Sequence, residues 1–303
     1  MGIINMSMKI FGRSYSDYVG KTLSVVSPIM PDKLYISLFY WLTFHRRINL
    51  KHPSTFNEKL QWLKLHDKHP EFTQLVDKYA CREIVTRLVG ENYLIPLLGV
   101  WDSFEKIDFD ALPNQFVLKT NHDSQGIVIC KDKKSFNVTE ARKKLTKCLK
   151  HNYFWNSREY PYKNVKRCII AEQFMEDKLW GELRDYKFFC FNGKVEFLYV
   201  ASGRQSGKLK FDFFDKDLKT IPVKQCHPNS DVVPELPYNI HEMIRIAEVL
   251  CQNYREIRID LYNIEGKIYF GEFTIFHEGG LVPFEPKEYD EYFGKLISLP
   301  TDN

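Results

Sequence analysis

The hydrophobic pattern of the chain changes close to residue 90. Before that point, apolar residues recur at helical spacing over residues 56–65 and again over residues 72–88. Beyond it, apolar and polar residues alternate in short runs, as side chains do on the two faces of a β-strand. The change predicts an α+β protein, with a mostly helical region at residues 1–92 and mixed lobes over residues 93–303.

The clearest local signal in the second region is a β-hairpin. Residues 183–191 and 194–201 alternate on either side of Asn192-Gly193, a dipeptide typical of two-residue hairpin turns. Ser54-Thr55 before Glu58 predicts a helix start with a capping box. Further strands are expected at residues 93–100, 115–120, 127–130, 166–174 and 208–214, with Pro113-Asn114 as the turn joining the first two, and further helices at residues 139–150 and 239–252.

Composition excludes several classes of function. The chain has 43 Lys and Arg against 39 Asp and Glu, a balance too even to make nucleic acid the expected partner. Its seven cysteines form no C-x-x-C pair, which favours free thiols in a cytoplasmic protein over a zinc site or a disulfide framework. No signal peptide is expected at the N-terminus, and residues 1–30 are expected to be irregular.

The most apolar run of the chain is Leu34–Phe44. It is too short for a transmembrane helix, which needs about 20 residues. A buried helix is the simpler interpretation, and a docking surface for a membrane or a partner is the alternative.

Acidic and basic residues cluster in a second hairpin near the C-terminus. Its strands are expected at residues 257–261 and 267–274, around a turn at residues 263–266. Positions i and i+2 of a strand share a face, so Arg258 lies beside Asp260, and Glu272 beside Thr274. If the strands pair, two carboxylates and a hydroxyl converge into an oxygen site suited to magnesium with phosphates. The alternative is an exposed hairpin with ordinary cross-strand ion pairs.

Three earlier segments could contribute to such a site. Lys119 ends an apolar strand and precedes the polar loop 121–126, whose backbone N–H groups could bind phosphate; a plain hairpin loop is the alternative. Glu172 ends another apolar strand that could form a wall for a purine, or it could simply be solvated. Lys187 lies in the first hairpin, where alternation leaves open whether it faces inward or toward solvent.

These features occur in the order found in the ATP-grasp superfamily, and the chain resembles most closely its teichuronopeptide-biosynthesis, or TupA-like, branch. The segments that carry the resemblance are TFNEKLQWLKL (55–65), LVDKYACRE (75–83), YLIPLLGVWDSFEKIDFDALPNQFVLKTNHDSQG (93–126), DYKFFCFNGKV (185–195) and RIDLYNIEGKIYFGEFTIFHEGG (258–280). The resemblance implies an ATP-grasp fold in which two α+β lobes clamp ATP, a small lobe at about 115–175 and a C-terminal lobe at 176–303.

The resemblance also implies a set of site residues. Thr274 stands where many ATP-grasp enzymes have Asn, which leaves a second metal open. The acid that binds the ribose is Glu176, Asp177 or Glu182, with Glu182 favoured. ATP is expected at Lys78, Lys119, Ser124, Gly126, Glu172, Gln173, Met175 and Glu182, Mg²⁺ at Asp260, Glu272 and Thr274, catalysis at Arg258 and Lys187, and the acceptor substrate at His277, Glu278, Gly279 and Gly280.

The activity implied is a magnesium-ATP-dependent carboxylate–amine ligase of bacterial surface polysaccharide biosynthesis, for example one that joins an amino acid to a uronic acid. Two alternatives stay open: an ATP-dependent kinase for a sugar or another hydroxyl, and a glycosyltransferase-associated protein without ligase activity. The expected partners are carboxylate and amine substrates, free or attached to a saccharide, with a peripheral place at the inner face of the membrane or in a polysaccharide-assembly complex as a further expectation.

Overall fold

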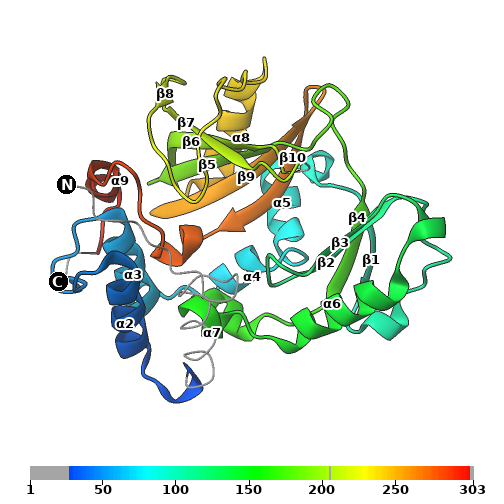
Figure 1. The fold of residues 1–303 in the computed structure, drawn as a ribbon, viewed down its shortest axis with the longest axis horizontal. Helices are drawn as coiled ribbons and strands as arrows, with labels where there is room; N and C mark the ends of the chain where they lie inside the picture. The colour runs from blue at the N-terminus through cyan, green and yellow to red at the C-terminus, as the bar shows by residue number, and fades with distance from the viewer. Residues whose placement is uncertain (1–26, 205, 301–303) are drawn as a thin grey trace.

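The computed structural model describes residues 27–204 and 206–300, which form two antiparallel sheets with helices around them (Figure 1). The small sheet has the strand order β1-β4-β2-β3, and the large sheet β10-β9-β5-β6-β7-β8. The strands of the small sheet are β1 (Leu97–Trp101), β2 (Phe116–Thr120), β3 (Ile127–Cys130) and β4 (Ile169–Gln173). The strands of the large sheet are β5 (Asp185–Phe191), β6 (Lys194–Ser202), β7 (Lys210–Asp215), β8 (Thr220–Ile221), β9 (Glu256–Ile264) and β10 (Lys267–Thr274). The helices are η1 (Ser27–Ile29), α2 (Asp32–Phe44), α3 (Phe56–His66), α4 (Phe72–Val76), α5 (Cys81–Val89), α6 (Val138–Lys150), α7 (Phe154–Ser157), α8 (Ile240–Cys251) and α9 (Glu288–Leu296), with short 3₁₀ turns η2 (Glu91–Tyr93), η3 (Phe104–Lys106), η4 (Lys133–Ser135), η5 (Tyr160–Asn164) and η6 (His277–Gly280). The expected irregular segment lies mostly outside the described residues, because residues 1–26 are not described.

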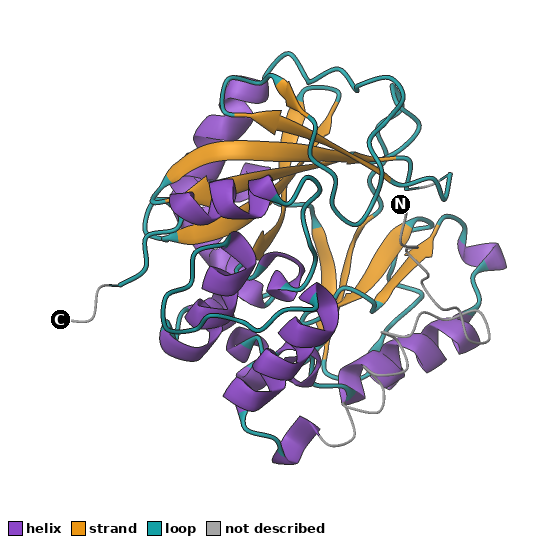
Figure 2. Cartoon of the chain, turned by 60° about the vertical axis from the view of Figure 1, so that its left-hand side comes forward, coloured by secondary structure: helices purple, strands orange, loops and turns teal. Residues whose placement is uncertain are grey.

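The two sheets occupy separate parts of the molecule and have separate cores (Figure 2). Phe116 and Leu118 of β2 point toward α6, where Leu145 is fully buried. In the large sheet, every residue of β5 is buried, because this central strand has β9 and β6 as neighbours and helices beside it. The sheets therefore form two rigid walls, and the polar residues on their facing sides can lie close together.

Both predicted hairpins form, with two-residue turns. Asn192 and Gly193 have φ of 50° and 79°, and Glu265 and Gly266 have φ of 51° and 88°. Two positive φ values in succession define the turn whose twist matches that of paired strands, which explains the Asn-Gly signal. The second turn is narrower than the expected 263–266, because Ile264 already pairs with Lys267.

The helix expected at residues 72–88 is wrong as one element. The chain forms α4 and α5 with a tight turn between them. Asp77 Oδ1 accepts hydrogen bonds from the backbone N–H of Tyr79 (2.8 Å) and of Ala80 (3.1 Å), and a carboxylate that bonds nearby backbone in this way ends a helix. The backbone N–H of Lys78 is then free to donate to the Asn121 carbonyl at 2.9 Å, which attaches the turn to the small sheet.

The expected pairing of the first two strands across Pro113-Asn114 is also wrong. Strand β1 pairs with β4, and β4 in turn pairs with β2, so β4 lies between them. Phe104, on η3, is buried in the small-sheet core, and it draws the connection across the sheet instead of into a tight turn. The capping box of α3 is confirmed: Thr55 accepts from the Glu58 N–H while the Glu58 side chain accepts from the Thr55 N–H. None of the helices within residues 27–204 and 206–300 is both long and apolar enough to cross a bilayer.

Candidate active site

A cavity of about 300 Å³ lies between the two sheets. The small sheet contributes apolar side chains, including Val117 of β2 and Ile129 of β3, and the large sheet contributes most of the charges. The complete lining is Lys78, Ile95, Val117, Lys119, Ser124, Ile127, Ile129, Gln173, Phe174, Met175, Leu183, Asp185, Lys187, Arg204, Asp260, Tyr262, Gly271 and Glu272.

Glu172 neutralises two cations on the small-sheet wall. Its carboxylate accepts from Lys119 Nζ at 2.6 Å and from Arg82 Nη1 at 3.3 Å, and only 7% of the residue is exposed. Lys119 points toward the cavity because it alternates with Leu118, which points into the core. Glu172 therefore holds the ammonium of Lys119 at the cavity wall.

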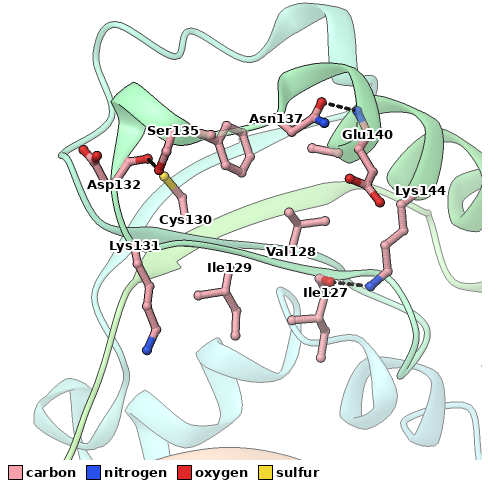
Figure 3. Close-up of a pocket in the computed structure, with 12 residues that line it drawn as sticks. Ile127, Val128, Ile129, Cys130, Lys131, Asp132, Ser135, Asn137, Glu140 and Lys144 are labelled. Atoms are coloured by element: carbon pink, nitrogen blue, oxygen red, sulfur yellow. Dashed lines mark hydrogen bonds between the residues drawn. The ribbon is translucent and has the colours of Figure 1, made fainter. Parts of the chain in front are cut away.

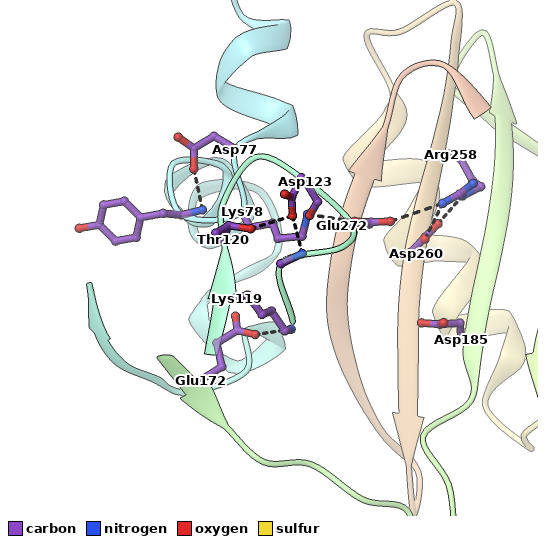
Figure 4. A network of polar contacts seen from close by, with 12 residues as sticks. Asp77, Lys78, Lys119, Thr120, Asp123, Glu172, Asp185, Arg258, Asp260 and Glu272 are labelled. Atoms are coloured by element: carbon purple, nitrogen blue, oxygen red, sulfur yellow. Dashed lines mark hydrogen bonds and ion pairs between the residues drawn. The ribbon is translucent and has the colours of Figure 1, made fainter. Parts of the chain in front are cut away.

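Lys78 bridges the two walls. Its ammonium donates to the Asp123 carbonyl of the loop 121–126 at 2.9 Å and lies 3.5 Å from Glu272 Oε2 of the large sheet (Figure 4). The break between α4 and α5 is what brings Lys78 to this position.

The single glycine of the loop 121–126 is required by packing. Asp123 Oδ1 accepts from the Thr120 hydroxyl and from the Gly126 N–H, both at 2.7 Å. A Cβ on Gly126 would lie 1.8 Å from Thr120 Oγ1, so only glycine fits against this pair. Ser124, at the tip of the loop, lines the cavity.

A β-bulge at Gly271 sets the facing residues of the large sheet. From Lys267 to Phe270 the register of β10 with β9 is regular, and it shifts by one residue before Glu272. Without the shift, Glu272 would lie opposite Ile259 and point into the core. With it, Glu272 lies opposite Asp260, and Thr274 opposite Arg258. The expected convergence of these four side chains on one face therefore depends on one extra residue.

Asp260 is held by two cations. Its oxygens accept from Arg258 Nε at 2.6 Å and Nη2 at 2.8 Å, and Lys187 of β5 makes a short ion pair with the same carboxylate. Burial alone would raise the pKa of Asp260, but Arg258 and Lys187 outweigh it and hold that pKa well below the ordinary value. Arg258 also lies 3.5 Å from Glu272 Oε1, so one guanidinium spans both carboxylates.

His277 fixes the other side of Arg258. Its Nδ1 accepts from Arg258 Nη1 at 2.5 Å, and its Nε2 lies 2.6 Å from the amide oxygen of Gln225. This pattern assigns the proton to Nε2 and makes the ring neutral. Burial, followed by the charge of Arg258, lowers the pKa of His277 well below its ordinary value, in agreement with that assignment.

The loop that follows His277 is held from beneath by α3. Gln61 Nε2 donates to the carbonyls of Gly279 and Gly280 at 2.8 and 2.7 Å, and Lys64 Nζ donates to the Gly279 carbonyl at 2.6 Å. Glu278 and both glycines have positive φ, from 49° to 61°. Glu278 is exposed, whereas His277, Gly279 and Gly280 are buried, so of the expected acceptor residues only Glu278 presents its side chain to solvent.

The comparisons with known proteins identify one family for this chain. A family model described as TupA-like ATPgrasp matches residues 58–298. The chain belongs to the TupA-like ATP-grasp family. No curated protein matches it. Solved structures with similarity include the D-alanine–D-alanine ligases from Bacillus anthracis (19% identity, 67% of this chain and 57% of that one, TM-score 0.39) and from Helicobacter pylori (14%, 82% and 70%, 0.44), and the L-amino acid ligase from Bacillus licheniformis (14%, 74% and 49%, 0.41). This chain thus spans little more than half the length of the first of them.

The expected site residues of this TupA-like protein are not all at the cavity. Lys78, Lys119, Ser124, Gln173, Met175, Lys187, Asp260 and Glu272 line it. Glu182 does not line the cavity; its carboxylate accepts from the Gly203 N–H at 2.7 Å. Thr274 lies opposite Arg258 in the sheet, and neither residue lines the cavity. Gly126, Glu172 and the residues of the loop 277–280 are not among the lining residues either.

Two cavity residues were missed by sequence reasoning. Arg204 Nη2 lies 2.9 Å from Asp185 Oδ2, and Lys187 Nζ lies 3.9 Å from the same oxygen. Asp185 and Lys187 are two residues apart on β5 and therefore point to the same side of the sheet. The turn alone does not place Arg204, because the register of β5 with β6 shifts by one residue beyond Cys190, so that Asp185 pairs with Ala201 and not with Val200. Arg82, the second cation on Glu172, has no helical signal either, because Lys78 lies in the turn before α5 and not in the helix.

The carboxylates fit a hard cation such as Mg²⁺. Asp260 and Glu272 offer only oxygen donors, and Glu272 is held loosely, by cations at 3.5 Å on either side, with 36% of its side chain exposed. In the described part of the chain no group of three or more His, Cys, Asp and Glu side chains could hold a metal by itself. Mg²⁺ commonly takes one or two carboxylates and completes its shell with phosphate oxygens and waters, so two carboxylates beside a phosphate site suffice.

A second hollow, of about 500 Å³, lies between β3 and α6 (Figure 3). Lys144 of α6 donates to the Ile127 carbonyl at 2.7 Å, which satisfies one backbone acceptor of the free edge of β3. Asn137 caps α6 by accepting from the Glu140 N–H at 3.0 Å. The polar side chains here serve the helix and the sheet edge, and the ion-pair network of the active site lies elsewhere.

Proposed function

We propose that this TupA-like protein is a magnesium-ATP-dependent carboxylate–amine ligase. The observation that carries the proposal is the opposition of two sets of charges across one cavity. Lys78 and Lys119 line it from the small-sheet side, and Asp260 and Glu272 line it from the large sheet. Arg258 does not line the cavity itself but pairs with both of these carboxylates. Cations that grip phosphates on one wall, facing a carboxylate pair that takes a metal on the other, suit in-line phosphoryl transfer from ATP.

The nucleotide would lie against the small sheet. Val117, Ile129 and Met175 offer an apolar surface for the base, beside the backbone of the β4 end. The ammonium groups of Lys119 and Lys78 would bind the phosphates. Lys119 has to exchange Glu172 for a phosphate oxygen in that step, and Arg82 then remains to neutralise Glu172.

Asp260 and Glu272 would hold Mg²⁺, with Thr274 as a candidate for a further oxygen. The ion, when bound, supplies positive charge to the phosphate oxygens during transfer. Lys187 and Arg258 keep Asp260 ionised, and the guanidinium of Arg258 would stabilise charge that develops on the transferred phosphoryl group.

The chemistry proceeds in two steps. A carboxylate oxygen of the acceptor attacks the γ-phosphorus, the bond to the ADP oxygen breaks, and an acyl phosphate forms. A neutral amine then attacks the acyl carbon, inorganic phosphate leaves, and the amine loses a proton as the amide forms. The loop 277–280 adjoins Arg258, so we place the acceptor there, with Glu278 as the residue that can reach it.

The substrates we propose are components of bacterial surface polysaccharide assembly, such as a uronic acid and an amino acid. The support is the family resemblance. We place the reaction in the cytoplasm, where ATP is available and where the seven free cysteines would stay reduced.

The experiment is an ADP-release assay with pairs drawn from uronic acids and amino acids, with product masses measured. The proposal predicts ADP only when both an acid and an amine are present, and a product lighter than their sum by one water. ATP binding without turnover across all pairs would contradict it. A stable phosphate ester would instead indicate a kinase. Glu272→Gln tests the role of the protein in the cell. If cells that carry this variant make their surface polysaccharide normally, the protein acts there without ligase catalysis.

A further inference from the structure

The outer face of α2 exposes large apolar side chains. Leu34 is 56% and Trp41 51% exposed, and Leu38 lies between them at half-burial. Spacings of four and three residues place these three side chains along one stripe of the helix, about 10 Å long. Ile29, just before the helix, is 85% exposed and extends the apolar surface. We call Ile29, Leu34, Leu38 and Trp41 the α2 stripe.

The opposite face of α2 is the one that packs against the rest of the protein. Tyr35, Ile36 and Tyr40 are at most 2% exposed. The Tyr35 hydroxyl donates to the carbonyls of Trp155 and Asn156 at 3.1 and 2.9 Å, and both bonds attach α2 to α7. The α2 stripe is therefore surplus to the core, and apolar surface left exposed in this way marks an interaction site.

The charged residues next to the α2 stripe in the sequence are mostly basic. Lys33, Arg47 and Lys51 are exposed, and Arg46 is exposed although it pairs with Glu58. Asp32 is the one acidic residue within residues 27–54 of the sequence, and it lies 3.0 Å from Arg158. A partner that covers this surface should therefore be apolar within and anionic at its boundary.

We propose that the α2 stripe binds the interface of an anionic lipid bilayer. The helix would lie in the plane of the membrane, with Leu34, Leu38 and Trp41 among the acyl chains and Lys33, Arg47 and Lys51 at the headgroup phosphates. A leucine and a tryptophan beside basic residues are the side chains that suit such a boundary. Helix α2, drawn in blue, lies at the outer edge of the molecule in Figure 1, away from both sheets, so the cavity between the sheets stays open to solution.

The experiment is sedimentation of the full chain with sucrose-loaded vesicles, of phosphatidylcholine alone or with phosphatidylglycerol. Binding should need the anionic lipid and weaken as salt is added. Leu34→Ser with Trp41→Ser should lower the partition coefficient at least about tenfold, because these two side chains are exposed in the free protein and would be buried among the acyl chains of the bilayer. Arg47→Gln with Lys51→Gln should lower it only on the anionic vesicles.

The matched control is Val232→Ser with Tyr238→Ser, which alters two side chains that are 84% and 87% exposed elsewhere on the surface. It should bind as the wild type does. Unchanged nucleotide affinity in the α2 variant shows that it is folded. The proposal is overturned if the wild type does not bind the anionic vesicles, if the α2 and control variants bind equally, or if the wild type forms a dimer that only the α2 variant loses, since the stripe then joins two copies of the chain.

Discussion

Replacement of Lys187 by Met tests the ion-pair network around Asp260. Lys187 is 7% exposed, and its ammonium contacts the carboxylate of Asp260, which is 1% exposed. Removing one partner of an isolated buried pair costs about 3–5 kcal/mol. Here Asp260 keeps the two hydrogen bonds from Arg258, so what is lost is one charge-assisted hydrogen bond. We expect the free energy of unfolding at pH 7 to fall by about 1.5–3 kcal/mol.

The pH dependence of that loss has a defined sign. Burial alone would raise the pKa of Asp260, but Arg258 and Lys187 outweigh burial and hold this pKa below its value in the unfolded chain. The stability that this provides is complete above the unfolded pKa, about 3.9, and is lost as pH falls through the folded pKa. Without Lys187 the folded pKa moves up toward the unfolded one. The deficit of the variant should therefore be full at pH 7 and shrink below about pH 4.

The assay is urea unfolding of the wild type and Lys187→Met between pH 3 and pH 7. Lys194→Met is the matched control, because Lys194 lies in the same hairpin and pairs with Glu248 at 3.2 Å, but 70% of its side chain is exposed. An exposed pair contributes about 0–1 kcal/mol. The reasoning is refuted if the two variants lose the same stability at pH 7, or if the deficit of Lys187→Met grows as the pH falls.

Three further predictions concern the surroundings of the site. Both carboxyl oxygens of Glu256 lack a hydrogen-bond partner among the described residues, and burial raises its pKa well above the ordinary value. The folded state is therefore most favoured while Glu256 is protonated, below its unfolded pKa, and this advantage is lost as pH rises toward the folded pKa. From about pH 5 upward, the free energy of unfolding of the wild type should fall by about 1.4 kcal/mol per pH unit relative to Glu256→Gln, as measured by urea unfolding. Parallel pH profiles of the two proteins would contradict this. Lys64→Met should lower the rate of ADP release about tenfold or more and leave nucleotide affinity unchanged, because Lys64 holds the Gly279 carbonyl two residues from His277. Lys59→Met, on the same helix, is the control and should change neither quantity. Equal effects of the two variants would show a general loss of stability. Gly126→Ala should weaken nucleotide binding by about tenfold or more in calorimetry, since its Cβ would overlap Thr120 Oγ1, and wild-type affinity would show that the loop 121–126 does not touch the nucleotide.

The elements of the large sheet could be predicted because local signals specify them. Asn192-Gly193 sets the turn and the register of β5 with β6 as far as Cys190, beyond which the register shifts by one residue. Within β5, alternation decides which side chains share a face. The same logic placed Asp260 and Glu272 on neighbouring strands. It did not reveal the bulge at Gly271, without which Glu272 would point into the core. An isolated glycine in a strand is a hint of a bulge, but the choice between bulge and regular pairing depends on packing across the whole sheet.

Long-range order was harder to predict. No local sequence signal predicts that β4 lies between β1 and β2, because this order depends on the burial of Phe104 in the core of the small sheet. Nor does the sequence show that Asp77 turns the chain and sends Lys78 toward Glu272, since residues 72–88 keep helical spacing through the break. Partners such as Gln61 and Lys64 belong to a helix more than 200 residues away from the loop they hold. The family resemblance gave Lys78 and Glu272 a role before any geometry could, but it gave none to Asp77, Gln61 or Lys64.

The measurement that tests the central claim most directly is calorimetric titration of a non-hydrolysable ATP analogue, with Mg²⁺ and with EDTA, into the wild type and Glu272→Gln. Glu272 is partly exposed and held only at 3.5 Å, so its replacement should spare the fold. Glu265→Gln, in the exposed turn of the same hairpin, is the control. The account predicts that Mg²⁺ strengthens binding to the wild type and the control about tenfold or more, and that Glu272→Gln loses this dependence while it keeps the affinity measured in EDTA. Equal strengthening by Mg²⁺ in Glu272→Gln would contradict the claim that the ion is held where β9 meets β10.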